Sequence, residues 1–212
     1  MHNALSNGTY RAKFSLLDRF RLAEKITKAV WYLHTVGWIH KNIRSQNIVF
    51  LTTSYGDIDY SSPLLVGFEF SRPEDDTTAY SGFDNDFGKN LYRHPMRQNA
   101  PTVRFQKSHD LYALGLVLLE IGASQPLIDM LRDIHAGQIG PDLPQSSIMN
   151  PRQTMASFQR IATERLGHAM GQHYSTAVVK CLTAKSGDGA DSAEVYRELV
   201  MNVAVENLVG TL

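Results

Sequence analysis

The chain has one cysteine, no excess of either charge and no long uninterrupted apolar run. Cys181 cannot form an intramolecular disulfide, which agrees with a reducing compartment. Basic and acidic residues each number 21 of 212, so nothing indicates a nucleic-acid partner. The longest apolar run, residues 111–119, is far shorter than the roughly 20 residues of a membrane span. With no signal peptide visible at the start, the sequence predicts a cytoplasmic protein without a membrane span.

What is present is mostly helical periodicity. Ser15 followed by Asp18 is typical of a helix start, and Gly37 of a helix end. Between them, apolar residues recur at steps of three and four, as on one face of a helix: Leu16, Phe20, Ala23, Ile26, Val30 and Leu33. Residues 110–121 are apolar almost all round, which is typical of a helix buried at the centre of a domain.

The rest of the chain supplies one small β element and further helices. Residues 48–51 and 63–66 read as short strands that would form a hairpin with a long connection. Residues 71–107 and 135–152 read as loops, and helices fit residues 156–165, 174–182 and 192–207. We therefore expect a mainly α (α+β) fold, with a flexible segment at residues 1–14 and one domain over residues 15–208.

Four motifs follow one another in the order expected of one catalytic scaffold. The chain reads His40-Lys41-Asn42-Ile43-Arg44-Ser45-Gln46-Asn47, then Val66-Gly67-Phe68, then Tyr92-Arg93-His94-Pro95, then Ser108-His109-Asp110-Leu111. The first motif resembles the protein-kinase catalytic loop H-R-D-L-x-x-x-N, and the second stands where kinases have D-F-G. The third resembles the end of the activation segment, and the fourth the start of the buried central helix.

The chain thus resembles the C-terminal lobe of a eukaryotic protein kinase over most of its length. Its loop is similar to the H-K-x-I-R-S-x-N of fungal kinase-like proteins associated with incompatibility and cell-death signalling. The resemblance makes His40, Lys41 and Arg44 catalytic-loop residues. It also gives Asp110 a structural role as acceptor of hydrogen bonds from the loop backbone, and Pro95 a structural role in the activation segment.

Two departures bear on catalysis. Asn42 stands at the position of the aspartate that accepts the substrate proton, and an amide cannot take a proton at neutral pH. Gly67 stands at the position of the metal-binding aspartate. Asn47 remains as a cofactor-binding and metal-binding candidate, but a single neutral oxygen is a weak magnesium ligand because such sites usually include a carboxylate.

The residues before the first helix leave no room for an N-terminal lobe with its glycine-rich loop and lysine. We therefore expect the N-lobe to be absent, and the leading hypothesis is a catalytically impaired pseudokinase that acts as a signalling and interaction module. On that hypothesis no cofactor is expected, and the partners are proteins, including an N-lobe or upstream domain. The alternative is a divergent ATP-dependent serine/threonine kinase whose N-lobe is missing from this chain, with ATP and Mg²⁺ as cofactors.

A second D-F-G occurs literally at Asp86-Phe87-Gly88. It lies too close to Pro95 to leave room for an activation segment, and no β-like run precedes it. We interpret it as a coincidence within a loop.

Overall fold

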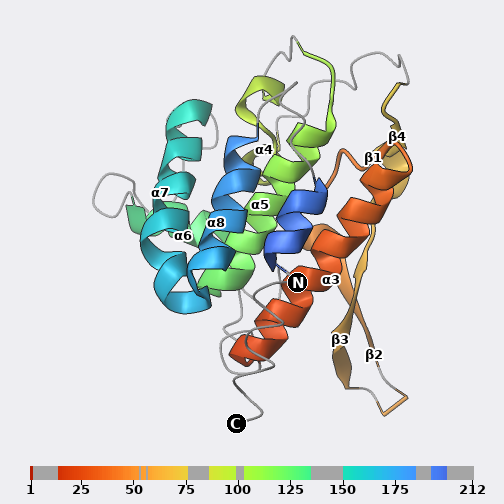
Figure 1. Cartoon of the computed structure of the whole chain (residues 1–212), viewed down its shortest axis with the longest axis vertical. Coiled ribbons are helices and arrows are strands. Elements are labelled where there is room, and N and C mark those ends of the chain that lie inside the picture. Colours follow the sequence, from red (N-terminus) through yellow and green to blue (C-terminus); the bar gives the residue numbers. More distant parts are fainter. Residues whose placement is uncertain are drawn as a thin grey trace.

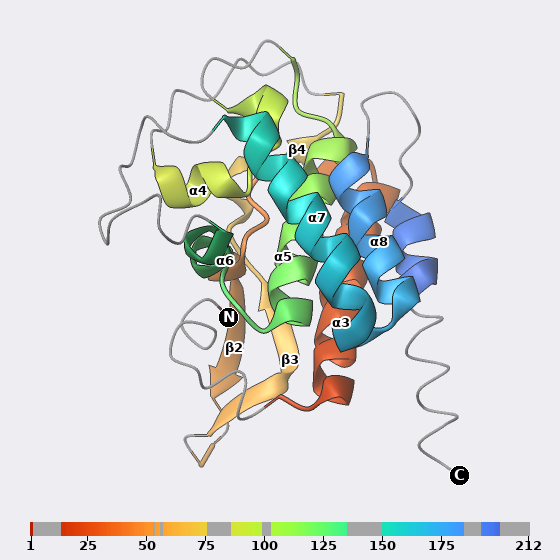
Figure 2. The same cartoon turned by 90° about the vertical axis from the view of Figure 1, so that its left-hand side faces the viewer.

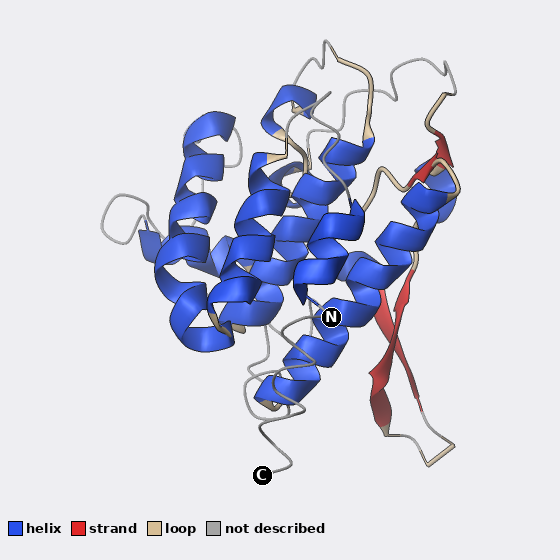
Figure 3. Cartoon of the chain, viewed as in Figure 1, coloured by secondary structure: helices blue, strands red, loops and turns tan. Residues whose placement is uncertain are grey.

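The computed structural model describes residues 1, 14–52, 54–55, 57–75, 86–98, 103–134, 150–184 and 192–199. Over these residues the molecule is a bundle of helices with two small antiparallel sheets at one side (Figures 1 and 3). The mainly α fold class is confirmed.

The first long helix, α3 (Leu16–Thr35), begins where the sequence predicts. The Ser15 hydroxyl accepts a hydrogen bond from the Asp18 backbone N–H, and the Asp18 carboxylate accepts one from the Ser15 N–H. This reciprocal capping satisfies two backbone donors that the helix itself leaves unpaired. Phe20, Ile26 and Val30 lie on its buried face, as the periodicity indicates.

Both sheets have two strands. β2 (Ile48–Thr52) pairs with β3 (Ile58–Leu65) in a hairpin beside α3, and β1 (Trp38–Ile39) pairs with β4 (Arg72–Pro73). The predicted hairpin is confirmed, but its long connection is wrong, because β3 begins at Ile58 rather than at Pro63. The second sheet was not predicted.

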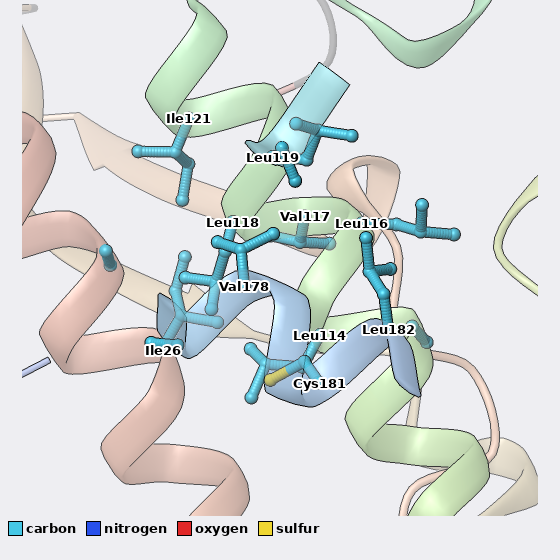
Figure 4. Packing of buried hydrophobic residues seen from close by; sticks show 14 of the residues in the cluster. Ile26, Leu114, Leu116, Val117, Leu118, Leu119, Ile121, Val178, Cys181 and Leu182 are labelled. Carbon is cyan, nitrogen blue, oxygen red and sulfur yellow. The ribbon is translucent and has the colours of Figure 1, made fainter. Parts of the chain in front are cut away.

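The centre of the bundle is α5 (Lys107–Ala123), whose side chains from Ser108 to Gly122 are all buried. It packs against α3, α7 (Pro151–Met170) and α8 (Gln172–Thr183). Figure 4 shows Leu114 and Leu118 of α5 meeting Val178 and Cys181 of α8. Each fully buried aliphatic side chain contributes about 1.5–3 kcal/mol of transfer free energy, so the packing of α8 on α5 stabilises the centre of the bundle.

The structure corrects three expectations about the secondary structure. The segment 71–107 is not wholly irregular: it holds β4, the short helix α4 (Phe87–Leu91) and the 3₁₀ turn η3 (Pro95–Arg97). Helix α6 (Leu127–Ile134) was not predicted, and α7 begins at Pro151 rather than near residue 156 because Asn150 caps it. Residues 192–199 are helical as predicted, while residues 2–13, 135–149 and 200–207 of the predicted segments lie outside the described residues.

No single helix within the described ranges is long and apolar enough to cross a membrane. Only α5 and α6 taken together reach that length and hydropathy, and a bend of 75° separates them.

Candidate functional site

The segment His40–Asn47 connects β1 to β2 and is anchored to the buried helix α5 through Asp110. The Asp110 carboxylate accepts hydrogen bonds from the backbone N–H groups of His40 (2.6 Å) and Lys41 (2.9 Å). It also accepts one from Nε2 of His34, the last buried residue of α3, at 3.2 Å. Asp110 is fully buried, and three donors satisfy a carboxylate that would otherwise be costly to desolvate. The backbone hydrogen bonds are those expected for Asp110.

His34 was not expected to take part. From the sequence, His34 is expected to be a polar residue at the end of the helix, and its position one turn before Gly37 is the available signal. In the structure its ring joins α3 to α5 and to the loop.

Lys41 holds the loop in an unusual conformation, with φ of 67° in the left-handed region. Such a conformation costs a residue with a Cβ about 1–2 kcal/mol. The Lys41 N–H bond to Asp110 compensates for this cost, and the turn brings the side chains that follow it back toward residue 67.

Asn42, Asn47 and Gly67, which the kinase resemblance assigns to one site, lie together in the structure. Nδ2 of Asn47 donates to the backbone oxygen of Asn42 at 2.7 Å, and Nδ2 of Asn42 donates to Oε1 of Glu69 at 3.0 Å. Glu69 lies in the 3₁₀ turn η2 (Phe68–Phe70) and is exposed. Glu69 is not among the predicted site residues, and its position two residues after Gly67 is the sequence signal that points to it.

Gly67 is required by the local geometry. Its φ is 90°, and an ideal Cβ at this position would lie 2.8 Å from Cγ of Asn47 and closer still to its Nδ2. It would also lie 3.2 Å from Nδ2 of Asn42. The carboxamide of Asn47 therefore fills the space that the first carbon of an aspartate side chain at 67 would need.

His40 packs beneath this cluster rather than within it. Its ring is buried and meets the ring of Phe68 edge-on, with centroids 4.5 Å apart, while its Nδ1 accepts from the Asn42 N–H at 3.3 Å. Burial lowers the pKa of His40 below its ordinary value, although the charge of Asp110 acts in the opposite direction. The neutral His40 ring therefore stabilises the loop through its packing against Phe68 and its hydrogen bond from Asn42.

A second buried network joins the same loop to the segment after α4. Ser45, in the 3₁₀ turn η1 (Ser45–Asn47), lies 2.7 Å from the Tyr92 hydroxyl, which donates to Oε2 of Glu120 at 2.8 Å. Oε1 of Glu120 accepts from the Leu127 N–H at the start of α6. Burial raises the pKa of Glu120 to about 7, and burial with the nearby Glu120 charge raises that of Tyr92.

The remaining predicted residues lie around these networks. Arg44 is half-buried, and its Nε has no hydrogen-bond partner among the described residues. Pro95 is the first residue of η3, where its fixed φ suits a helical start. Asp86 caps α4 through the Lys89 N–H at 3.1 Å, so the second D-F-G begins a helix rather than lying in a loop.

The metal-binding capacity of the described site is low. Glu69 is the carboxylate beside the amides of Asn42 and Asn47, while the Asp110 carboxylate is engaged by the loop backbone and His34. Within the described ranges, no group of three histidine, cysteine, aspartate or glutamate side chains is suited to a metal. Magnesium sites normally use one or two carboxylates, so the donors here fit Mg²⁺ poorly.

Comparison of the sequence with known proteins finds distant relatives among protein kinases. No family model matches the chain. It is 30% identical over 155 residues, 69% of its length, to a probable LRR receptor-like serine/threonine-protein kinase of Arabidopsis thaliana. A second such kinase of that plant is 26% identical over 202 residues, 90% of the chain. Kinase suppressor of Ras 2 from Homo sapiens is 27% identical over 115 residues, half of the chain.

The chain is kinase-like. It spans 16%, 20% and 11% of the length of these three relatives, so the relationship concerns one part of each. The finer resemblance to fungal incompatibility-type proteins stays a prediction.

Proposed function

We propose that this kinase-like domain has lost useful phosphotransfer and acts as a signalling module that binds other proteins. The observation that carries the proposal is the packing of Asn47 onto Gly67. A metal-binding aspartate at 67 would displace the Asn47 carboxamide, so the two metal positions of a kinase cannot both be filled in this arrangement.

The position of the general base supports the same proposal. The Asn42 amide nitrogen is not basic, and its N–H donates a hydrogen bond to Oε1 of Glu69. Loss of a positioned general base lowers a rate by about 10²–10⁴. Loss of the metal aspartate removes, in addition, an electrostatic term that is often the largest single contribution to catalysis.

Buried hydrogen bonds nevertheless hold the loop at residues 40–47 to the helices around it. Asp110 holds the loop, and Glu120 ties it to Tyr92 and α6. An interaction module needs such a rigid framework even when it performs no chemistry. Keeping the framework while losing the base and the metal carboxylate is what the proposal requires.

Exposed apolar side chains on the hairpin and on η2 support a partner-binding role. Three hairpin residues are roughly half exposed (Leu51 at 55%, Ile58 at 48%, Leu64 at 43%), and so are Phe68 at 48% and Phe70 at 45% in η2. Leu51 and Ile58 belong to consecutive register pairs and so face opposite sides of the hairpin, which offers apolar contact on both sides. An N-lobe or another domain supplied elsewhere is the partner that the kinase resemblance implies.

The second candidate is a divergent serine/threonine kinase that uses ATP and Mg²⁺. One observation favours it. Oε1 of Glu69 lies 3.0 Å from Nδ2 of Asn42, so the site contains one negatively charged side chain. The relatives' printed names are also those of serine/threonine kinases. In this candidate, Glu69 would take the place of the lost carboxylates, and the N-lobe would come from outside the chain.

The test is a phosphotransfer assay of the purified chain and its Asn42→Asp variant, with ATP and Mg²⁺ or Mn²⁺ and a general protein substrate. We expect no transfer by either protein, because restoring the base leaves Gly67 and Asn47 unchanged. The Glu69→Gln variant is the matched control. Robust transfer by the Asn42→Asp variant that is lost on adding Glu69→Gln would establish the second candidate instead.

A further inference from the structure

A cavity of about 340 Å³ lies at the opposite end of the helices from the loop described above. It is formed by the first turn of α3, the end of α5 and the last turns of α7, which lie together at the lower end of the bundle in Figures 1 and 2. Small-molecule sites usually span about 300–1,000 Å³, so the volume is sufficient for a small ligand.

The lining is positively charged. It includes the guanidinium groups of Arg19 and Arg165, and none of its described residues is acidic. The polar side chains of Ser124 and Gln125 lie beside the two arginines. Gln125 donates to the exposed carboxylate of Asp133, which is outside the lining, at 2.8 Å.

The two arginines differ in how they are held. Nη1 of Arg19 donates to the Gly122 oxygen at 3.1 Å and lies 3.4 Å from the Ser124 hydroxyl, so this guanidinium is fixed in place. The carbonyl end of α5 offsets part of its charge. Arg165 is exposed and makes no ion pair or hydrogen bond with another described residue. The uncompensated charge of the cavity is therefore that of Arg165.

The remaining lining is apolar. Phe14 and Leu166 are buried, and Ala123 and Ala169 complete the wall. A ligand that fits both the cationic and the apolar part of the lining has an oxyanion group attached to a compact apolar or aromatic group. Arginine recognises such oxyanions through paired N–H donors.

We propose that this cavity is a binding site for small organic oxyanions, with Arg165 as the principal cationic contact and Arg19 as a fixed second one. Carboxylate and phosphate head groups share this chemistry. The site is separate from the loop at residues 40–47, so it operates whether or not the domain transfers phosphate.

The experiment follows backbone amide signals of the ¹⁵N-labelled chain by NMR during titration with benzoate, phenyl phosphate or benzyl alcohol. The alcohol is the neutral control of similar size. We expect both anions to shift signals of residues lining the cavity, and the alcohol to shift them little. The anion that binds more tightly identifies the preferred head group.

The Arg165→Gln variant should bind the anions about two- to fivefold more weakly, the range for an exposed charge pair. Arg160→Gln is the matched control, because Arg160 is exposed on the same helix but does not line the cavity. It should leave binding unchanged.

Three results would overturn the proposal. The first is the absence of shifts at the cavity up to the solubility of the probes. The second is benzyl alcohol binding as tightly as benzoate, which would make the cavity merely apolar. The third is an equal loss of binding in both arginine variants, which would indicate general charge attraction rather than a site.

Discussion

Substitution of Gly67 by alanine tests the packing on which the proposed function rests. Two costs are expected. The first is conformational: a φ of 90° is unfavourable for any residue with a Cβ, by about 1–2 kcal/mol. The second is steric, because the new Cβ would lie 2.8 Å from Cγ of Asn47.

The steric cost follows from what Asn47 would lose. Its side chain can move away only by giving up the 2.7 Å hydrogen bond to the Asn42 oxygen. Leaving that partly buried acceptor unpaired costs about 1–3 kcal/mol. The two terms together predict that Gly67→Ala lowers the free energy of unfolding by about 2–5 kcal/mol.

Gly37 provides the matched control. Its φ is 76°, but no atom lies within 4 Å of an ideal Cβ there. Gly37→Ala should therefore show only the conformational cost of about 1–2 kcal/mol. The measurement is urea-induced unfolding of both variants and the wild type, followed by circular dichroism.

A double variant separates the two terms further. In an Asn47→Ala background, Gly67→Ala should cost no more than Gly37→Ala does in the wild type, because the obstructing side chain has gone. Equal destabilisation by Gly67→Ala and Gly37→Ala in the wild type would refute the reasoning, and the site would then have room for an aspartate.

Three further predictions concern buried charged and titratable groups. Asp110→Asn should lower the free energy of unfolding by on the order of 3 kcal/mol, since three donors lose a charged acceptor. Asp57→Asn, at an exposed position, should change it by less than about 0.5 kcal/mol, and comparable losses in urea unfolding would contradict the anchoring role. Burial lowers the pKa of His109 from 6.5 to about 4, so the unfolded state binds more protons between these values and stability rises with pH across that window. His109→Asn should remove about 3 kcal/mol of this dependence, and an unchanged pH profile of unfolding would count against it. Burial raises the pKa of Glu120 from 4.5 to about 7, so here the folded state binds the extra proton and stability falls as pH rises through that window. Glu120→Gln should lose this dependence, so its stability relative to the wild type should rise by about 3 kcal/mol between pH 4 and pH 8, and a difference that stays constant with pH would contradict the prediction.

Much of the helical framework could be predicted because its signals are local. Ser15 and Asp18 cap α3 through contacts three residues apart, and α5 is apolar on every face because it is buried on every face. The hydrogen bonds of Asp110 were expected from the kinase resemblance.

The missed elements lacked a local signal or had one that was overlooked. No residue of β3 is fully buried, and residues 58–62 show no alternation of apolar and polar residues. The pairing of β1 with β4 joins two residues to two others more than 30 positions away. Helix α6 had a signal: Leu127, Met130 and Leu131 have helical spacing and are buried.

In the site, too, the residues within recognisable motifs could be predicted, whereas contacts between residues of different segments could not. Asn42, Asn47 and Gly67 could be assigned to one site from the resemblance to the kinase motifs. Glu69 could not, because its contact with Asn42 depends on how η2 turns after Gly67. The link from His34 to Asp110 joins residues 76 positions apart, which no local pattern encodes.

The measurement that tests the central claim most directly is a thermal-shift titration of the chain with ATP, with and without Mg²⁺ or Mn²⁺. A ligand that binds only the folded state adds about 2.7 kcal/mol at about 100 times its Kd. For a domain of this size that corresponds to a rise in Tm of about 5–10 °C. The account predicts no metal-dependent shift, because Asn47 is packed onto Gly67 and donates to Asn42. A shift that requires the metal and disappears in Glu69→Gln would contradict it, and would show a working nucleotide site.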